Sequence, residues 1–106
     1  MYNDPDFSNK ELDFIRNEIG PENVHEIPAV MGGEDFGRFG RQEPKIPSFL
    51  FWLGGVSKDD WERYQKGEIT LASNHSPFFA PIPQPTLSTG VSAITSSAIS
   101  LLQNKK

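Results

Sequence analysis

At 106 residues the chain is long enough for one modest hydrophobic core and too short for two independent ones. Its net charge of -4 argues against nucleic acid and anionic membrane surfaces as partners, since both are bound through clustered lysine and arginine. The absence of cysteine excludes disulfide bridges and thiolate metal ligands, and no apolar run approaches the roughly 18 residues that a membrane span needs.

The first predicted element is a helix that ends near Ile19, because glycine and proline follow it. Its start carries two competing signals. Asp4 before Pro5 fits an N-cap followed by the first helical position. Ser8 with Glu11 fits a capping box one turn later. The sequence therefore predicts where this helix ends and leaves its start open by one turn.

Two short strands are predicted next, over 24–27 and 49–53. Residues 48–53 (SFLFWL) are nearly continuous in large apolar side chains, which suits a strand covered on both faces within an α/β sheet. Between the strands, residues 31–36 (MGGEDF) form a glycine turn that leads into a short helix. These elements predict the α/β fold class, with a short sheet and flanking helices.

A further short helix is predicted where Ser57 and Asp60 provide start signals and Gly67 provides the end. The segment 68–85 follows, with prolines at 77, 81, 83 and 85. Each proline removes a backbone donor and restricts the residue before it, so this segment is predicted to be a stiff loop.

The last predicted helix runs from about Thr86 to about Gln103. Its large apolar residues recur at steps of four and three, which predicts one buried face made of Leu87, Val91, Ile94, Ala98 and Leu101. The small residues Gly90, Ala93 and Ser97 would allow close approach to a sheet.

The stiff loop contains the segment 74–79 (NHSPFF), which places a proline and two aromatic residues beside His75. Such neighbours could fix the direction of the imidazole, as a metal ligand requires. The alternative interpretation is a plain surface histidine, the usual state of a single histidine in a loop. His25, next to Glu26 in a weak strand, is interpreted as structural.

Gly32 and Gly33 precede a short helix and could offer backbone N–H groups to an anion such as a substrate carboxylate. A plain tight turn explains the same pair of glycines. Glu34 and Asp35 are adjacent, and adjacent helical side chains point about 100° apart, which argues against a paired acid and base. Their position at a helix start favours interaction with the helix dipole.

Three segments together are similar, in order and spacing, to one zinc metallopeptidase family. It includes hippurate hydrolase, N-acyl-amino-acid amidohydrolases, auxin-conjugate hydrolases and bacterial carboxypeptidases. The segments are 31–36 (MGGEDF), 47–54 (PSFLFWLG) and 75–79 (HSPFF), the last followed by a helix opened by Thr89-Gly90-Val91. The resemblance covers nearly the whole chain, from about Asn3 to Leu102.

The resemblance implies that residues 1–106 are a single segment, the C-terminal portion of a catalytic domain of the zinc-peptidase type. In the family an inserted lid domain, often used for dimerisation, precedes this portion. His75 would be the last ligand of a two-metal zinc site, and Gly32, Gly33 and Glu34 would border the substrate cleft. The implied reaction is hydrolysis of the amide bond of N-acyl amino acids or small peptides.

The other metal ligands of the family and its glutamate base lie upstream of anything in this chain, so no catalytic residue is assigned here. Zinc-dependent amide hydrolysis needs an activated water and a general base, and a catalytic zinc usually has three protein ligands. We therefore expect the chain to be inactive alone. An alternative of another class is a stand-alone, non-enzymatic interaction protein that retains this partial fold.

The predicted strand 49–53 also bears on association. It is apolar on both faces, and in the family the sheet would continue into strands that this chain lacks. An open sheet edge and an uncovered apolar patch rarely stay unpaired. Self-association of the isolated chain is the expected consequence.

Overall fold

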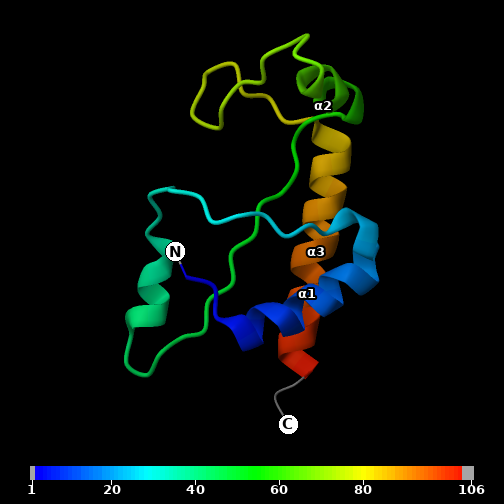
Figure 1. The fold of residues 1–106 in the computed structure, drawn as a ribbon. Helices are drawn as coiled ribbons and strands as arrows, with labels where there is room; N and C mark the ends of the chain where they lie inside the picture. Colours follow the sequence, from blue (N-terminus) through cyan, green and yellow to red (C-terminus); the bar gives the residue numbers. More distant parts are fainter. Residues whose placement is uncertain (1, 104–106) are drawn as a thin grey trace. The chain divides into compact units, whose positions relative to one another are not determined.

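The computed structural model describes residues 2–103, and all the regular secondary structure in this range is helical. The described residues form three α-helices, and long irregular segments join the helices (Figure 1). In chain order, with the two 3-10 helices η1 and η2, the elements are α1 (Pro5–Ile19), η1 (Pro21–Asn23), η2 (Phe36–Arg41), α2 (Lys58–Gln65) and α3 (Pro83–Gln103).

The chain divides into two compact units. The first unit combines Met1–Trp52 with Val91–Lys106, so it contains α1 and most of α3. The second unit is Leu53–Gly90, which contains α2, the proline-rich segment and the first turns of α3.

The predicted sheet is wrong, because the structure has no strand between residues 2 and 103. A strand needs a neighbour to complete its backbone hydrogen bonds, and neither 24–27 nor 49–53 has one. The side-chain amide of Asn3 instead bonds to both the N–H and the carbonyl of Leu50, each at 2.9 Å. Asp4 N–H donates to the Ser48 carbonyl at 2.9 Å. The residues before α1 therefore occupy the place beside 48–50 that a sheet would have given to another strand.

Helix α1 begins at Pro5, which decides between the two start signals in the sequence. The Asp4 carboxylate caps the helix by accepting a hydrogen bond from the N–H of Phe7 at 2.9 Å. Ser8 and Glu11, the competing capping box, lie inside the helix and on its buried side. The proline signal thus determines the start.

Glycine ends both α1 and α2, as the sequence predicts. Gly20 follows α1 with a φ of 89°, and its N–H donates to the Arg16 carbonyl at 3.0 Å. Gly67 follows α2 with a φ of 73°, and its N–H donates to the Tyr64 carbonyl at 2.9 Å. Both values of φ lie where a side chain would be strained, so glycine is the residue that fits.

Helix α3 reaches Gln103 as predicted, but it begins at Pro83 and buries a different face. All five residues of the predicted buried face, Leu87, Val91, Ile94, Ala98 and Leu101, are exposed. Ala93 and Ser100 are buried instead, each at 1% exposure.

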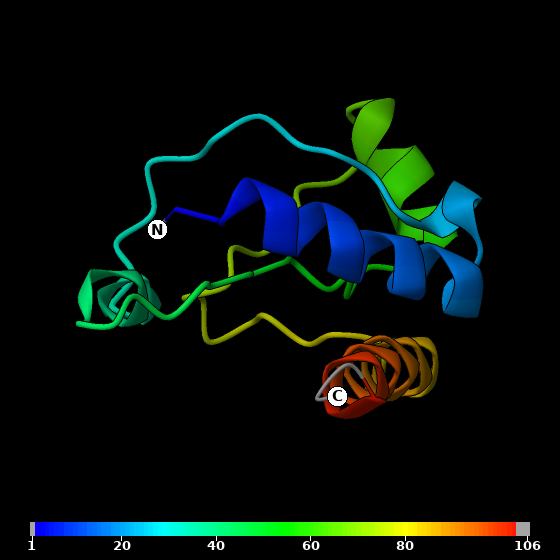
Figure 2. The same ribbon diagram turned by 90° about the horizontal axis from the view of Figure 1, so that it is seen from below.

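In the first unit α1 crosses α3, as Figures 1 and 2 show, and Ser100 Oγ donates to Glu11 Oε1 at 3.4 Å. Small side chains let the two helices approach closely, and this contact decides which face is buried.

The second unit is held together through two glycines that precede α2. The carbonyl of Gly55 accepts from Ile82 N–H at 2.9 Å, and the carbonyl of Gly54 accepts from Thr86 Oγ1 at 3.1 Å. A Cβ placed on Gly90 would lie 2.8 Å from Cδ2 of Leu53. The first turns of α3 therefore pack tightly against residues 53–55.

The hydrophobic core is very small. Among the described residues, Ile15 and Ala93 are the buried hydrophobic ones, both in the first unit. Large apolar side chains such as Trp52 and Phe78 are exposed, at 59% and 85%. No helix in the described range is both long and apolar enough to span a membrane.

Candidate functional site

His75 lies in a pair of consecutive turns in the second unit. Ser76 N–H donates to the Ser73 carbonyl at 2.9 Å, and Phe79 N–H donates to the Ser76 carbonyl at 3.0 Å. The Ser76 hydroxyl also accepts from Phe78 N–H at 3.2 Å. These bonds fix the backbone on the C-terminal side of His75, while its imidazole is exposed and has no hydrogen-bond partner in the described structure. The loop is ordered around a side chain that is free to bind a ligand.

A zinc ion requires more than this single imidazole. Zinc sites in proteins use three or four protein ligands, usually histidine, cysteine and carboxylates. Residues 2–103 contain no group of three or more such side chains that could hold a metal ion. The described residues therefore bring together fewer than three such side chains at any one place.

Gly32, Gly33 and Glu34 lie in the first unit, in an exposed segment before η2. Neither glycine has a positive φ, and a Cβ on either would meet nothing within 4 Å. The Glu34 carboxylate accepts a hydrogen bond from Phe36 N–H at the start of η2. Glu34 thus has a local capping role, as its position before a helix suggested, and the short helix predicted after the glycines exists as a 3-10 helix.

The predicted metal ligand and the predicted substrate-binding residues lie in different compact units. His75 belongs to the second unit and the glycine turn to the first. That Gly32, Gly33 and Glu34 border a substrate cleft, and that His75 binds a metal, therefore stay predictions.

The second unit also contains a cavity of about 360 Å³ that the sequence did not reveal. Three separate segments line it, 55–60, 69–72 and 78–82, and its walls include Val56, Leu71 and Phe79. The last of these segments continues directly from the turns that hold His75, although His75 itself does not line the cavity. Polar residues, Ser57, Asp60 and Thr70, share this lining with the apolar ones, so the cavity is of mixed character.

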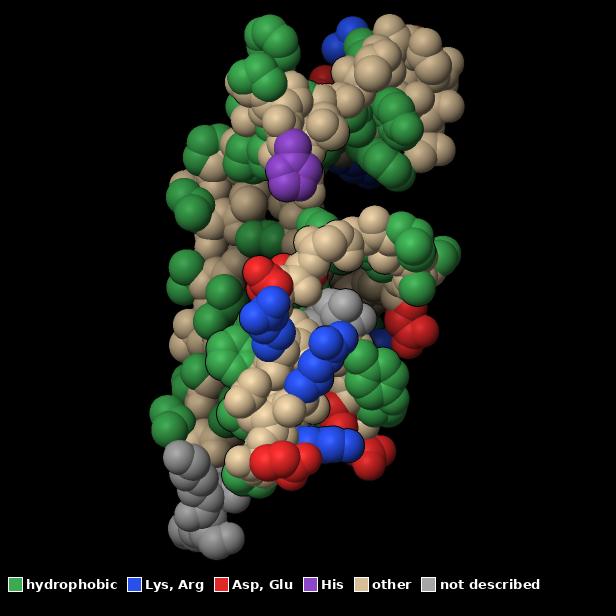
Figure 3. All heavy atoms as spheres, turned by 90° about the vertical axis from the view of Figure 1, so that its left-hand side faces the viewer, with side chains coloured by type: hydrophobic (Ala, Val, Ile, Leu, Met, Phe, Trp, Pro, Cys, Tyr) green, Lys and Arg blue, Asp and Glu red, His purple; other side chains and the backbone are tan. Residues whose placement is uncertain are grey.

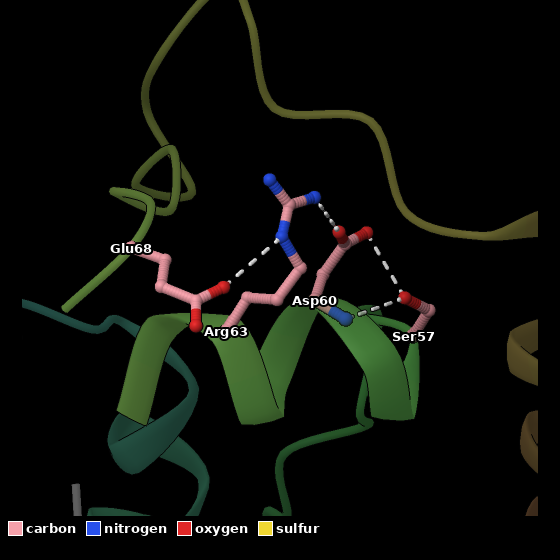
Figure 4. Close-up of polar contacts among 4 residues, drawn as sticks. All are labelled: Ser57, Asp60, Arg63 and Glu68. Atoms are coloured by element: carbon pink, nitrogen blue, oxygen red, sulfur yellow. Dashed lines mark hydrogen bonds and ion pairs between the residues drawn. The ribbon is translucent and has the colours of Figure 1, made fainter. Parts of the chain in front are cut away.

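Asp60 is the acidic residue of this cavity, and its carboxylate is already engaged. Figure 4 shows that Ser57 Oγ donates to Asp60 Oδ2 at 2.9 Å and accepts from Asp60 N–H at 3.1 Å. Arg63 bridges from Asp60 Oδ1, at 3.5 Å, to Glu68, at 3.7 Å. These contacts cap α2 and hold the Asp60 carboxylate in place at the cavity.

Comparison with known proteins gives one informative match. The chain is 42% identical over 52 residues to N-acetyldiaminopimelate deacetylase of Lactococcus lactis subsp. cremoris (strain SK11). The match covers 49% of this chain and 13% of the deacetylase. No protein-family model matches the chain. No solved structure matches it either.

About half of the chain is therefore similar to a small part of a deacetylase, which is an amidohydrolase. This agrees with the general kind of enzyme that the three sequence segments indicated. Because the chain matches only 13% of the length of that relative, the activity of the relative does not transfer to the chain as a finding.

Proposed function

We propose that this chain is the C-terminal segment of a metal-dependent amidohydrolase of the carboxypeptidase type. In this role it contributes His75 to a two-metal zinc site and hydrolyses nothing by itself. The observation that carries the proposal is the 42% identity to part of a deacetylase. The substrates proposed for the whole enzyme are N-acyl amino acids or small peptides, which are cleaved at the amide bond.

The conformation around His75 supports this role. Two turns order the loop, yet the imidazole makes no hydrogen bond and is exposed. The exposure leaves the imidazole accessible to a metal ion, although a plain surface histidine would be equally exposed. Metal-bound histidines usually donate their second ring N–H to a carboxylate or a carbonyl, and in this proposal the rest of the enzyme supplies that partner.

The glycine turn gives weaker support for a substrate-binding role of Gly32, Gly33 and Glu34. Neither φ nor a close contact within the chain requires glycine at 32 or 33. Glycine also serves where another molecule approaches the backbone closely. A substrate anion bound at the N–H groups of this turn would explain why both positions are glycine, which the contacts within the chain do not explain.

The test uses a chimera in which this chain replaces the corresponding part of the Lactococcus lactis deacetylase. We expect the folded chimera to bind zinc and to hydrolyse an N-acetyl amino acid. His75→Ala should lower the bound zinc and reduce the rate at least 100-fold, because one metal ligand is lost. His25→Ala is the matched control, since His25 is the other histidine of the chain and is also exposed.

Two results would refute the proposal. One is a folded His75→Ala chimera that keeps its zinc and its activity. The other is zinc-dependent hydrolysis by the 106-residue chain alone that a chelator abolishes. The second result would show that the chain holds a complete active site.

A further inference from the structure

The cavity of the second unit is lined in part by apolar side chains that the chain itself leaves exposed. Phe78 is 85% exposed, Val56 is 39% exposed and Phe79 is 37% exposed. Figure 3 shows hydrophobic side chains, in green, that are exposed on one face of the molecule. The volume of about 360 Å³ lies within the range of pockets that bind small molecules, roughly 300–1,000 Å³. The second unit therefore offers room and apolar surface to a small ligand.

The segment 69–72 supplies polar groups to the same wall. Its residues lie in an irregular stretch, and their backbone N–H and C=O groups make no hydrogen bond within the described residues. The Thr70 hydroxyl has no hydrogen-bond partner there either. Each of these residues carries one strong backbone donor and one strong backbone acceptor. This stretch can therefore both donate hydrogen bonds to a ligand and accept them from it.

The charges at the cavity argue against an ionic ligand. The described residues that line it include no lysine, arginine or histidine, so an anion would find no cationic partner. Asp60 could attract a cation, but Arg63 already lies 3.5 Å from its Oδ1, and Ser57 Oγ donates to its Oδ2 at 2.9 Å (Figure 4). A carboxylate with these two contacts still has lone pairs for a neutral N–H donor. An uncharged ligand with an N–H group suits these surroundings.

We propose that this cavity binds a small uncharged amide that carries an apolar group. The apolar group lies against Val56, Phe78 and Phe79, and the amide pairs with the backbone of 69–72. An amide has both a donor and an acceptor, so it can bond to this backbone and to the Asp60 carboxylate. A plain hydrocarbon would cover these polar groups without bonding to them, which costs free energy. This inference concerns binding by the second unit and does not depend on the enzymatic proposal.

Three probes of similar size that differ in charge test the inference. N-acetylphenylalaninamide is neutral, N-acetylphenylalanine is an anion, and phenylalaninamide is a cation at about pH 6. Each probe is titrated into the whole chain, and the backbone amide shifts of 55–60, 69–72 and 78–82 are followed by NMR. The neutral probe should bind with a dissociation constant of about 1 mM, as expected for a ligand of about 15 non-hydrogen atoms. Both charged probes should bind at least about fivefold more weakly, because the cavity leaves their charges unpaired.

Two substitutions at exposed positions of the wall show whether the probe occupies this cavity. Ala72→Trp adds an indole where the ligand would lie and should weaken binding of the neutral probe at least about tenfold. Phe78→Ala removes an aromatic wall and should weaken it at least about threefold. Ala98→Trp is the matched control, because Ala98 is an exposed alanine of α3 that does not line the cavity. Circular dichroism checks that each variant keeps its helix content.

Three results would overturn the proposal. One is the absence of saturable shifts with the neutral probe up to about 10 mM. Another is binding that Ala72→Trp and Phe78→Ala both leave unchanged, because the probe would then lie elsewhere on the chain. The third is tighter binding of either charged probe, because the cavity would then select for a charge.

Discussion

Ser100 Oγ donates a hydrogen bond to Glu11 Oε1 at 3.4 Å, which joins α3 to α1 between residues 89 positions apart in the chain. Glu11 is only 1% exposed, and its second oxygen, Oε2, has no hydrogen-bond partner in the described structure. A carboxylate in this position loses its hydration and receives one long hydrogen bond in return. The hydrogen bond from Ser100 therefore offsets only part of the free energy that it costs to bury the Glu11 carboxylate between the two helices.

Replacing Glu11 by methionine should stabilise the first unit. The variant Glu11→Met removes a buried carboxylate and keeps a long side chain with good helix propensity. We expect the free energy of unfolding to rise by about 1–3 kcal/mol in urea titrations followed by circular dichroism. The control Glu18→Met, at an exposed position of α1, should change it by less than about 0.5 kcal/mol. A clear loss of stability in Glu11→Met would show that the carboxylate is satisfied.

Gly20→Ala should destabilise the end of α1. The residue has a φ of 89°, and an added Cβ would collide with the Glu22 carboxylate. We expect a loss of about 1–3 kcal/mol in the free energy of unfolding. Gly33→Ala is the matched control, because its Cβ would meet nothing within 4 Å and its φ is not positive. Equal thermal stability of the two variants would contradict the observed backbone conformation.

Ser57→Ala should loosen α2. The Ser57 hydroxyl caps this eight-residue helix and bonds to the Asp60 side chain. Losing the cap should cost about 1 kcal/mol and speed the amide hydrogen exchange of residues 58–65. Ser73→Ala, an exposed serine of the same unit whose hydroxyl makes no hydrogen bond, should leave that exchange unchanged. If both variants exchange alike, the hydroxyl does not cap the helix.

The close approach of Leu53 to Gly90 predicts an energetic coupling between these residues. Gly90→Val places a branched side chain where a single Cβ would already lie 2.8 Å from Leu53 Cδ2. We expect a loss of about 1–3 kcal/mol from overpacking. Adding Leu53→Ala should recover part of that loss, so the double variant should lose less stability than the two single variants summed. Strict additivity would mean that the two residues do not touch.

The ends of the helices could be predicted from the sequence because neighbouring residues determine them. Ser57 and Gly67 bound α2, and glycine stops α1, through hydrogen bonds that span only a few residues. The choice between Asp4 and Ser8 as the start of α1 is also local, but both signals were well formed, and only the structure shows that Asp4 is the cap.

The sheet could not be predicted in the same way, because pairing depends on distant residues. The run 48–53 has the composition of a buried strand, yet Asn3 and Asp4 satisfy the backbone at Leu50 and Ser48 and leave no room for a ladder. The buried face of α3 was mispredicted for a related reason. Periodicity identified the apolar stripe correctly, but the contact with α1 selected Ala93 and Ser100 instead.

The candidate site was predictable only in part. The prolines and aromatic residues around His75 indicated a stiff loop, and the turns at Ser73 and Ser76 agree with that. The cavity of the second unit comes from three segments that only the fold brings together, so no short motif could have revealed it. The phenylalanines at 78 and 79, which line it, were the nearest available signal.

The pairing of α1 with the last part of α3 also determines the order in which the chain can fold during synthesis. Glu11 leaves the ribosome 89 residues before Ser100, a delay of about 4 to 18 seconds at about 5–20 residues per second. In this interval all of Leu53–Gly90 has been synthesised, whereas α1, a helix of 15 residues, still lacks the part of α3 that it contacts. A helix of that length is marginal alone in water. The unit that contains α1 can therefore be completed only after the whole of Leu53–Gly90 has been synthesised.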